Sequence, residues 1–360
     1  MGASLIILLS GWGYTGHSKI SNQLPEAMGN TIDGFDKWVP YIVDHSSDPD
    51  YRKSWDNAES PRHFIDVDTY PEFLASGKLN HNYDSLVTKY GASRVVEEGI
   101  LPWATQTTFD SLQFYFENND WNNARRMASD LSHYVGDGHM PLHVTFNYNG
   151  QETGNKGIHS RYESKMISRY ADSISVEVKP VEYIAAVDSF VFRYLYRSNR
   201  LCDSILKADN IAQKAAGNSD SDIYLASMWQ NTSEMTQMLF SESTYALGCL
   251  IYTAWVRAGS PSLEATSSSS EIVSTGIEIA ETFPNPVDSM LTVNLQLHDS
   301  CAYKIELRNV DGGFVGKIEA KPKNDGSNSF NIDMSSLAPG VYMVLVHNAH
   351  TSATKRVVKK

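Results

Sequence analysis

Histidine and carboxylate side chains recur at helical spacing in the middle of the chain. His133 and Asp137 are four residues apart, and so are His159 and Glu163. On a helix this spacing puts both side chains of a pair on one face, one turn apart. His143 follows a proline that is expected to end the first helix and turn the chain. Three imidazoles and two carboxylates should therefore converge, and these are ligand types of divalent cations, zinc above all.

A single His-xxx-Asp pair on a helix is more often a surface hydrogen bond, so its surroundings decide the interpretation. His133 and Asp137 lie with Asp130 on a face of their own, off the apolar stripe of the same segment. The second pair and the third histidine favour a metal site. His139 belongs to neither pair and is interpreted as a helix-end residue or as one that supports a ligand. The apolar stripe consists of Ala124, Met127, Ala128, Leu131, Tyr134 and Val135.

The length of 360 residues suggests two domains. The three cysteines, Cys202, Cys249 and Cys301, are too few and too scattered for a disulfide framework or a cysteine-based metal site. Any metal is therefore expected to be held by nitrogen and oxygen atoms.

The net charge of −12 is concentrated in the first part of the chain. Residues 276–360 hold nine of the 42 acidic and nine of the 30 basic residues, which leaves 33 acidic against 21 basic residues in 1–275. Acidic enzymes normally avoid polyanions. Bound dications would nevertheless make a pocket locally positive, so the net charge does not exclude a nucleic-acid substrate.

Residues 1–11 form a short apolar run that ends in small residues. The run is too short to span a bilayer and resembles the apolar part of a secretory signal peptide, although no basic residues precede it. A buried first strand is the alternative. Once this segment is removed, the chain would begin at Trp12, and residues 12–17 are too glycine-rich for regular structure. A free terminal amine beside the Trp12 carbonyl is a bidentate chelate that His17 could complete.

A second group of candidate ligands precedes the central pairs. It consists of Asp48, Asp50, His63, Asp66 and Asp68. Asx-Pro sequences are common turn formers, so Asp48 by itself would be a cap or turn residue. His63 by itself would more often be a packing residue.

Taken in order, these motifs resemble the zinc-dependent phospholipase C and S1/P1-type nuclease superfamily. They are Trp-Gly-x-x-Gly-His from Trp12, Asp48 fifteen residues before His-Phe-Ile-Asp, His-xxx-Asp-xxxxx-His from His133 and His-xxx-Glu from His159. The resemblance covers about residues 12–260. It implies a mainly α-helical catalytic domain that holds three zinc ions in one cleft.

The resemblance also implies how the ligands are shared. The first zinc is expected on Asp48, His63, His133 and Asp137, the second on Asp137, His17 and the amine and carbonyl of Trp12, and the third on His143, His159 and Glu163. Asp50 lies in the same turn and is the alternative to Asp48. Asp66 and Asp130 are candidates for the carboxylates that fix the histidine tautomers.

These metals indicate hydrolysis of phosphate esters by a zinc-activated water, with Asp48 or Asp50 as the catalytic carboxylate that orients it. The chain has no Gly-x-Ser-x-Gly elbow and no phosphate-cradling glycine loop, so no protein nucleophile is expected. At the last ligand position, Glu163 matches the phospholipases of this superfamily. Phe64 and Asp66 match the nucleases instead, near where that group binds its base, and are candidates for substrate binding.

Three functions remain open at this point. The first choice is a phospholipase C acting on phospholipid head-group esters, because of Glu163 and the excess of acidic residues in 1–275. The alternative on the same metals is a single-strand nuclease and 3′-nucleotidase. A surface binding protein with a structural metal site belongs to another class, and it is disfavoured because structural zinc is usually a closed four-ligand site.

The expected organisation is a probable signal peptide at 1–11, a helical domain at 12–259, a serine-rich linker at 260–275 and a β domain at 276–360. Helices are predicted at 101–116, 190–196, 201–216 and 223–257. After the linker the apolar residues alternate with period two at 291–297, 303–307 and 341–346, which indicates a small β-sandwich.

The β domain carries a second resemblance. Phe-Pro-Asn-Pro at 283–286, Leu-Ala-Pro-Gly-Val-Tyr at 337–342 and the basic end at 355–360 resemble the C-terminal sorting domain of proteins exported by the type IX secretion system. That resemblance implies export through the periplasm, contact with the type IX machinery, and release or surface attachment. A generic carbohydrate- or protein-binding β module is the alternative.

Overall fold

The structure is a computed structural model that describes residues 12–53, 56–219, 221–263, 277–297, 303–309, 314–320, 326–347 and 352–360. Contacts divide these residues into two compact units, a helical one over 12–263 and a β-structured one over 277–360. The predicted signal peptide and most of the predicted linker lie outside the described residues, so these two predictions stay predictions.

The helical unit is built from twenty helical segments among its described residues. The first ten are α1 (Gly13–Asn22), α2 (Leu24–Met28), η1 (Phe35–Trp38), α3 (Val39–His45), α4 (Asp48–Arg52), η2 (Ser60–His63), η3 (Val67–Thr69), α5 (Pro71–Ser76), α6 (Tyr83–Tyr90) and α7 (Ala92–Glu97). The others are α8 (Leu101–Glu117), α9 (Trp121–His139), η4 (Pro141–His143), α10 (Ile158–Ser160), η5 (Arg161–Met166), α11 (Ile167–Tyr170), η6 (Ala171–Ser173), α12 (Val187–Asn199), α13 (Cys202–Ala216) and α14 (Asp222–Arg257). The four helices predicted after residue 100 lie within α8, α12, α13 and α14.

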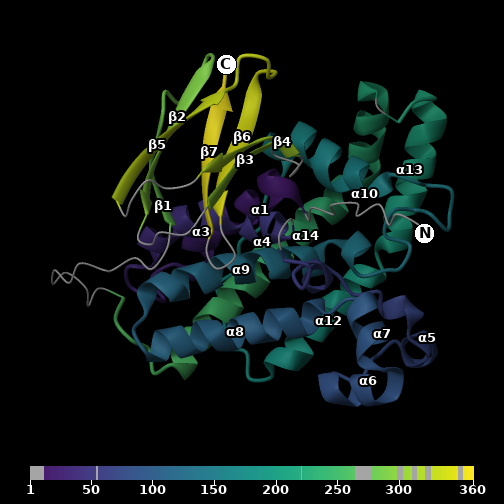
Figure 1. The fold of residues 1–360 in the computed structure, drawn as a ribbon. Helices are drawn as coiled ribbons and strands as arrows, with labels where there is room; N and C mark the ends of the chain where they lie inside the picture. The colour runs from purple at the N-terminus through teal and green to yellow at the C-terminus, as the bar shows by residue number, and fades with distance from the viewer. Residues whose placement is uncertain are drawn as a thin grey trace. The chain divides into compact units, whose positions relative to one another are not determined.

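Helix α9 is the element around which the helical unit packs. The Asp120 side chain caps its first turn by accepting a hydrogen bond from the Asn123 amide at 3.2 Å. Its apolar residues at helical spacing, among them Ala124, Ala128 and Leu131, are fully buried. Helices α3, α8, α12 and α14 all contact it, and α8 runs beside it along most of its length (Figure 1). The predicted apolar stripe is therefore one face of the central helix of this unit.

The expectation of irregular structure at 12–17 is wrong, because α1 begins at Gly13. A side chain at Gly16 would place its Cβ only 2.4 Å from Cβ of Trp12, so the glycine lets Trp12 lie against the helix. The Trp12 ring packs 4.8 Å from the ring of Phe240, and its Nε1 donates to the Gly136 carbonyl at 2.8 Å. Tertiary packing of this kind outweighs the low helix propensity of glycine.

The β unit contains seven strands among its described residues. They are β1 (Ile277–Phe283), β2 (Met290–Leu297), β3 (Tyr303–Asn309), β4 (Phe314–Ala320), β5 (Gly326–Asp333), β6 (Gly340–His347) and β7 (Ser352–Lys359). They form two antiparallel sheets, in the orders β1-β2-β5 and β4-β3-β6-β7. Leu291 and Val293 of one sheet share a buried core with Ile305, Val344 and Val346 of the other. The predicted β-sandwich is confirmed.

No helix in the described part of either unit combines the length and the apolar character that crossing a membrane requires.

Truncating the buried apolar face of α9 should destabilise the helical unit. Leu131 is fully buried, and Leu131→Ala removes apolar surface and leaves a cavity, so we expect a loss of about 2–5 kcal/mol in the free energy of unfolding. Chemical denaturation followed by circular dichroism measures this loss. Leu74, whose side chain is 70% exposed, is the matched control, and Leu74→Ala should change stability by less than about 0.5 kcal/mol. Equal effects of the two substitutions would contradict the packing described here.

Candidate metal centre

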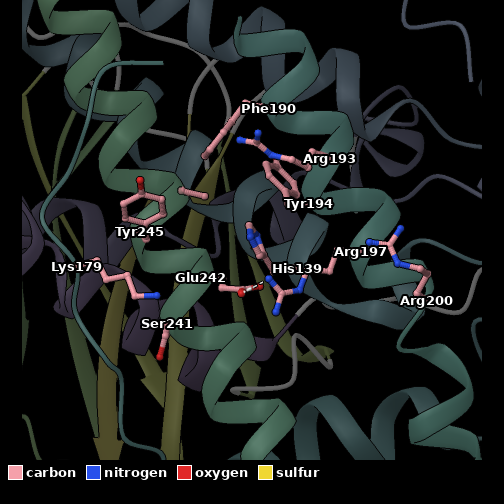
Figure 2. Close-up of a pocket in the computed structure, with 11 residues that line it drawn as sticks. His139, Lys179, Phe190, Arg193, Tyr194, Arg197, Arg200, Ser241, Glu242 and Tyr245 are labelled. Atoms are coloured by element: carbon pink, nitrogen blue, oxygen red, sulfur yellow. Dashed lines mark ion pairs between the residues drawn. The ribbon is translucent and has the colours of Figure 1, made fainter. Parts of the chain in front are cut away.

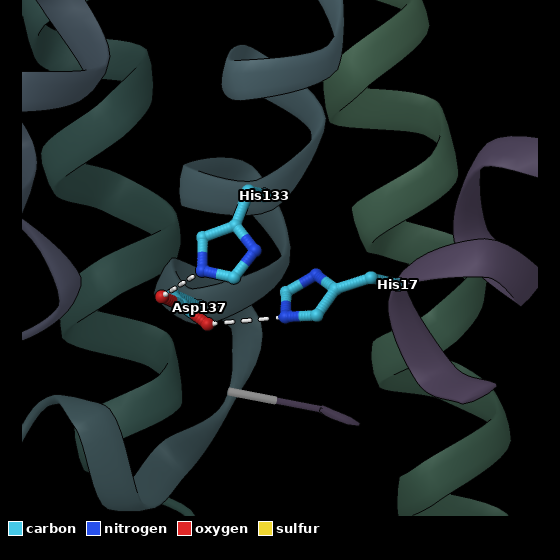
Figure 3. A group of neighbouring side chains, drawn as sticks. All are labelled: His17, His133 and Asp137. Carbon is cyan, nitrogen blue, oxygen red and sulfur yellow. Dashed lines mark ion pairs between the residues drawn. The ribbon is translucent and has the colours of Figure 1, made fainter. Parts of the chain in front are cut away.

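The pair predicted on α9 faces into the helical unit. His133 and Asp137 lie one turn apart and are fully buried. The Asp137 carboxylate lies between two imidazoles, with Oδ2 3.2 Å from Nε2 of His133 and Oδ1 3.5 Å from Nε2 of His17, which comes from α1 (Figure 3). These three residues form the first of three groups, among the described residues, whose ligand atoms could hold one cation.

Gly136 makes the approach of α1 to α9 possible. A Cβ on this residue would lie 2.8 Å from Nδ1 and 2.9 Å from Cε1 of His17. In its absence the rings of His17 and His133 stack at 4.1 Å between centroids. Gly136 was not predictable as part of the site, because a glycine requirement that comes from a helix distant in the chain leaves no local signal.

The second group joins Asp50, His63 and His133. Oδ1 of Asp50 lies 3.5 Å from Nδ1 of His63 and 3.6 Å from Nε2 of His133. Nδ1 of His63 is also 3.0 Å from Oδ2 of Asp137, so this group adjoins the first one. The short helix α4 supplies Asp50, and the 3-10 turn η2 supplies His63.

Of the two acids in α4, the structure brings Asp50 and not Asp48 to the imidazoles. The Asp48 carboxylate is turned toward His45, with Oδ2 2.8 Å from Nδ1 of that ring. Asp48 and Asp50 are two residues apart in one helical turn, so their side chains point in different directions. The geometry therefore favours Asp50, the alternative, over Asp48 as the ligand, and which of the two acts as the catalytic carboxylate stays a prediction.

The third group contains His143, His159 and Glu163, as the sequence predicts. Oε2 of Glu163 lies 2.9 Å from Nε2 of His159 and 3.4 Å from Nε2 of His143. Glu163 sits in η5, a single π-helical turn, a type of irregularity that is frequent at functional sites. Nδ1 of His143 is 3.7 Å from Oδ1 of Asp137, so the third group lies next to the first.

Backbone carbonyl groups orient three of the imidazoles. Nδ1 of His133 lies 2.8 Å from the Ser46 carbonyl oxygen, and Nδ1 of His143 lies 2.6 Å from that of His63. Nδ1 of His159 contacts the Tyr148 carbonyl oxygen at 3.2 Å. Because a carbonyl oxygen only accepts, each Nδ1 carries the hydrogen and each Nε2 turns its lone pair toward the centre. This tautomer is the one that binds a cation through Nε2.

His63 is oriented the other way round, by a carboxylate that the sequence analysis missed. Its Nε2 lies 3.3 Å from Oε1 of Glu59, which leaves Nδ1 facing Asp50 and Asp137. Glu59 is itself fixed by the Arg52 guanidinium at 3.1 Å and by the Tyr134 hydroxyl. The signal was in the sequence, because Glu59 precedes His63 by four residues, as His159 precedes Glu163.

Several of these nitrogen and oxygen atoms face one another without a hydrogen between them, an arrangement that suits a bound cation. Nε2 of His143 and Nε2 of His159 are 3.2 Å apart, so two lone pairs face each other unless a proton or a cation lies between them. Oδ1 of Asp137 and Oε2 of Glu163 are buried and make no hydrogen bond. Burial raises the pKa of Glu163 to about 8. Burial, together with the charge of the neighbouring His133, lowers the pKa of His17 to about 4. A bound dication would offset these penalties.

The remaining predicted residues lie around the three groups. Asp130 does not contact a ligand histidine; both of its oxygens accept from Arg52, at 2.9 and 3.0 Å. Asp66 is buried and also lies outside the three groups, beside the partly exposed Phe64. The Trp12 carbonyl accepts from the Gly16 amide at 3.1 Å, and its role as a terminal chelate stays a prediction.

Known structures resemble the chain at low sequence identity. Alpha-toxin of Clostridium perfringens, isolated from avian strain SWCP, is 11% identical with a TM-score of 0.44, over 97% of this chain and 93% of that one. Alpha toxin from Clostridium absonum is 13% identical with a TM-score of 0.41, over 96% and 98%. No curated protein matches the sequence. These values do not establish a shared activity, so function has to be argued from the side chains.

The β unit is identified by sequence. Residues 281–360 match the family described as the secretion system C-terminal sorting domain. The match confirms the sorting-domain prediction from the Phe-Pro-Asn-Pro motif and the basic end. Such domains mark proteins for type IX secretion, so this protein is exported and is either secreted or displayed at the cell surface.

Glu59 offers a test of the centre that leaves every proposed ligand side chain in place. Glu59→Gln keeps the size of the side chain but removes the negative charge that holds the Nε2 hydrogen of His63, so we expect metal affinity to fall about 10–100-fold. Metal content after dialysis against graded chelator concentrations measures the change. The exposed Glu97, changed to Gln, is the control and should have no effect. Unchanged metal content in Glu59→Gln would contradict the proposed orientation of His63.

Deleting residues 276–360 should abolish export and leave the helical unit folded, because each unit has a core of its own. Immunoblots of the medium, the cell surface and the periplasm of the native host measure the outcome. Full-length protein carrying His143→Ala is the control and should be exported normally. Truncated protein in the medium would show that the sorting domain is dispensable.

Proposed function

We propose that the helical unit is a zinc-dependent phosphoesterase of the phospholipase C type. One observation carries the proposal: three groups of buried imidazoles and carboxylates adjoin one another in a single region. A structural zinc site is usually a closed set of four ligands, and the number of donors here exceeds that. Adjacent cations are typical of enzymes that cleave phosphate esters.

The donor set favours zinc, because it consists of imidazole nitrogens and carboxylate oxygens without sulfur. Three ions are proposed. The first would be held by Asp50, His63, His133 and Asp137, the second by His17, Asp137 and the Trp12 amine and carbonyl of the processed chain, and the third by His143, His159 and Glu163.

Zinc in such a centre lowers the pKa of a bound water toward neutrality and neutralises charge on phosphoryl oxygens. The protein supplies orientation and charge. Although burial raises the pKa of Asp50, Lys53, His133 and His63 lower it more, to about 2, so this group is a carboxylate that can accept a hydrogen bond from water. Nζ of Lys53 is 2.6 Å from Oδ1 of Asp50 and is buried, so it can contact a substrate phosphoryl oxygen as a fixed cation.

A phospholipid head-group ester is the proposed substrate class. In the superfamily that the sequence resembles, the phospholipases have Glu at the position of Glu163, whereas the nucleases usually have Asp. The excess of acidic residues in 1–275 also favours a substrate with one phosphodiester over a polyanionic strand.

A single-strand nuclease and 3′-nucleotidase is the second candidate, and Asp66 is the observation in its favour. Burial, followed by the charges of Asp68 and Glu98, raises the pKa of Asp66 to about 8. A carboxyl group that is protonated at neutral pH can both donate and accept a hydrogen bond, as recognition of a base edge requires. Phe64, two residues earlier in the chain, offers an aromatic ring on which a base could stack.

Hydrolysis assays on the purified full chain separate these functions. We expect release of diacylglycerol from phosphatidylcholine vesicles, loss of that release on chelation and recovery on adding zinc. His143→Ala should lower the rate at least about a hundredfold, because it removes a ligand rather than a supporting residue. His81→Ala, outside the three groups, is the control and should leave the rate unchanged.

Three outcomes bear on the proposal in different ways. Nucleotide release from single-stranded DNA without lipid cleavage would replace the phospholipase by the nuclease. Bound zinc without any hydrolysis would leave a surface binding protein with a structural metal site. Full activity in His143→Ala would remove the metal assignment itself.

A further inference from the structure

A cavity of about 380 Å³ lies between α9, α12, α14 and the extended segment that precedes α12. Its lining is basic, with Lys179 from that segment and Arg193, Arg197 and Arg200 from α12 and its C-terminal end (Figure 2). Glu242 of α14 is the single carboxylate among its lining residues. A volume of this size is in the range of pockets that hold small organic ligands.

Positive side chains outnumber negative ones around this pocket. Arg193, Arg197 and Arg200 are four and three residues apart, so they share one face of α12, where like charges repel. Glu242 pairs with Arg197 alone. Lys179, Arg193 and Arg200 make no ion pair within the described ranges; their side chains are exposed at the rim of the cavity, and the Arg193 guanidinium lies 5.2 Å from the centroid of the Phe190 ring. Three cations without an ion-pair partner gather at the rim of one cavity of an otherwise acidic domain, where they favour an anionic ligand with more than one negative charge.

A buried histidine adds a polar atom to the wall. His139 is 2% exposed, and its Nδ1 donates to the Val135 carbonyl at 2.8 Å, so Nε2 remains available on the cavity side. The ring stacks on Tyr194 at 4.3 Å between centroids. Gly138 allows this packing, because a Cβ there would lie 2.5 Å from Cε2 of Tyr194. The wall is therefore fixed in place before any ligand arrives.

This pocket is distinct from the metal centre. His139 and Asp137 are two residues apart on α9, which turns their side chains to roughly opposite sides of the helix. None of the residues of the three metal groups lines the cavity. Phe190, Tyr194 and Tyr245 give it aromatic walls as well as cations.

We propose that this cavity binds a small phosphate monoester whose organic part lies against the aromatic walls. A phosphate monoester carries close to two negative charges, and guanidinium groups bind its oxygens in bidentate pairs. A nucleoside monophosphate and a phosphorylated lipid head group share this chemistry. Arg193 and Arg200 are the residues that contact the phosphate.

Calorimetric titration of the full chain tests the proposal with AMP and phosphocholine as the two sources of the group, inorganic phosphate as the bare anion, and adenosine and choline as phosphate-free controls. The same titrations in the presence of a chelator remove the contribution of metal bound at the centre, and binding at the pocket should persist there. The double variant Arg193→Ala/Arg200→Ala should lose at least about tenfold in affinity, because it loses charge-assisted hydrogen bonds. Arg126→Ala, an exposed arginine of α9 outside the cavity, is the matched control and should bind normally.

Binding of either ester that the double variant weakens and the control does not would support the pocket, and the stronger ester identifies the source. The absence of binding by the unaltered chain, equal binding by the double variant, or equal binding of adenosine or choline would overturn it. Unchanged zinc content and circular dichroism in the double variant distinguish loss of the pocket from loss of the fold. Because the titrations measure binding and not turnover, their result is independent of the proposed hydrolysis.

Discussion

Carboxylates buried among imidazoles are the constraint on which the helical unit depends. Asp137 has no exposed surface, and Glu163 has almost none. A charged group in that position costs several kcal/mol unless opposite charge and hydrogen bonds surround it. The compensating groups come from segments far apart in the chain, such as His17 of α1 and His63 of η2. The fold can bury these acids only if those segments meet at α9. The candidate metal centre and the packing of the helical unit therefore depend on the same contacts.

Contacts on the far side of the ring fix the orientation of four of the imidazoles. Main-chain carbonyls hold three of the rings, and Glu59, with Arg52 behind it, holds His63. None of these supporting atoms occupies the space between the ligand atoms. Two glycines complete the arrangement on opposite sides of α9: Gly136 admits the ring of His17, and Gly138 admits that of Tyr194. Helix α9 thereby lies between a centre of imidazoles and carboxylates on one side and a pocket lined by the arginines of α12 on the other.

Periodic features were predictable from the sequence, and contacts between distant segments were not. The spacing of His133 and Asp137, and of His159 and Glu163, placed each pair on one face of its helical segment, because that relation is local. The sequence could not decide between Asp48 and Asp50, since both fit the same turn and only the direction of α4 separates them. The helix α1 was missed because glycine counts against a helix locally, while its support comes from Phe240 and α9. Glu59 was missed although its spacing to His63 is helical, because a glutamate before a proline-containing turn has a simpler interpretation as a solvated residue.

The same burial ties the centre to protons as well as to metals. Although burial lowers the pKa of His133, Asp137 and Asp50 raise it to about 9, so without a dication a proton on this ring supplies the missing positive charge. A metal that binds through Nε2 has to displace that proton, so proton release and metal uptake are coupled. Folding is coupled to both, because the carboxylates need a cationic partner of one kind or the other once water is excluded. The stability of the helical unit and its capacity for chemistry therefore rest on the same charge balance, whereas the sorting domain, with equal numbers of acidic and basic residues and a core of its own, does not share it.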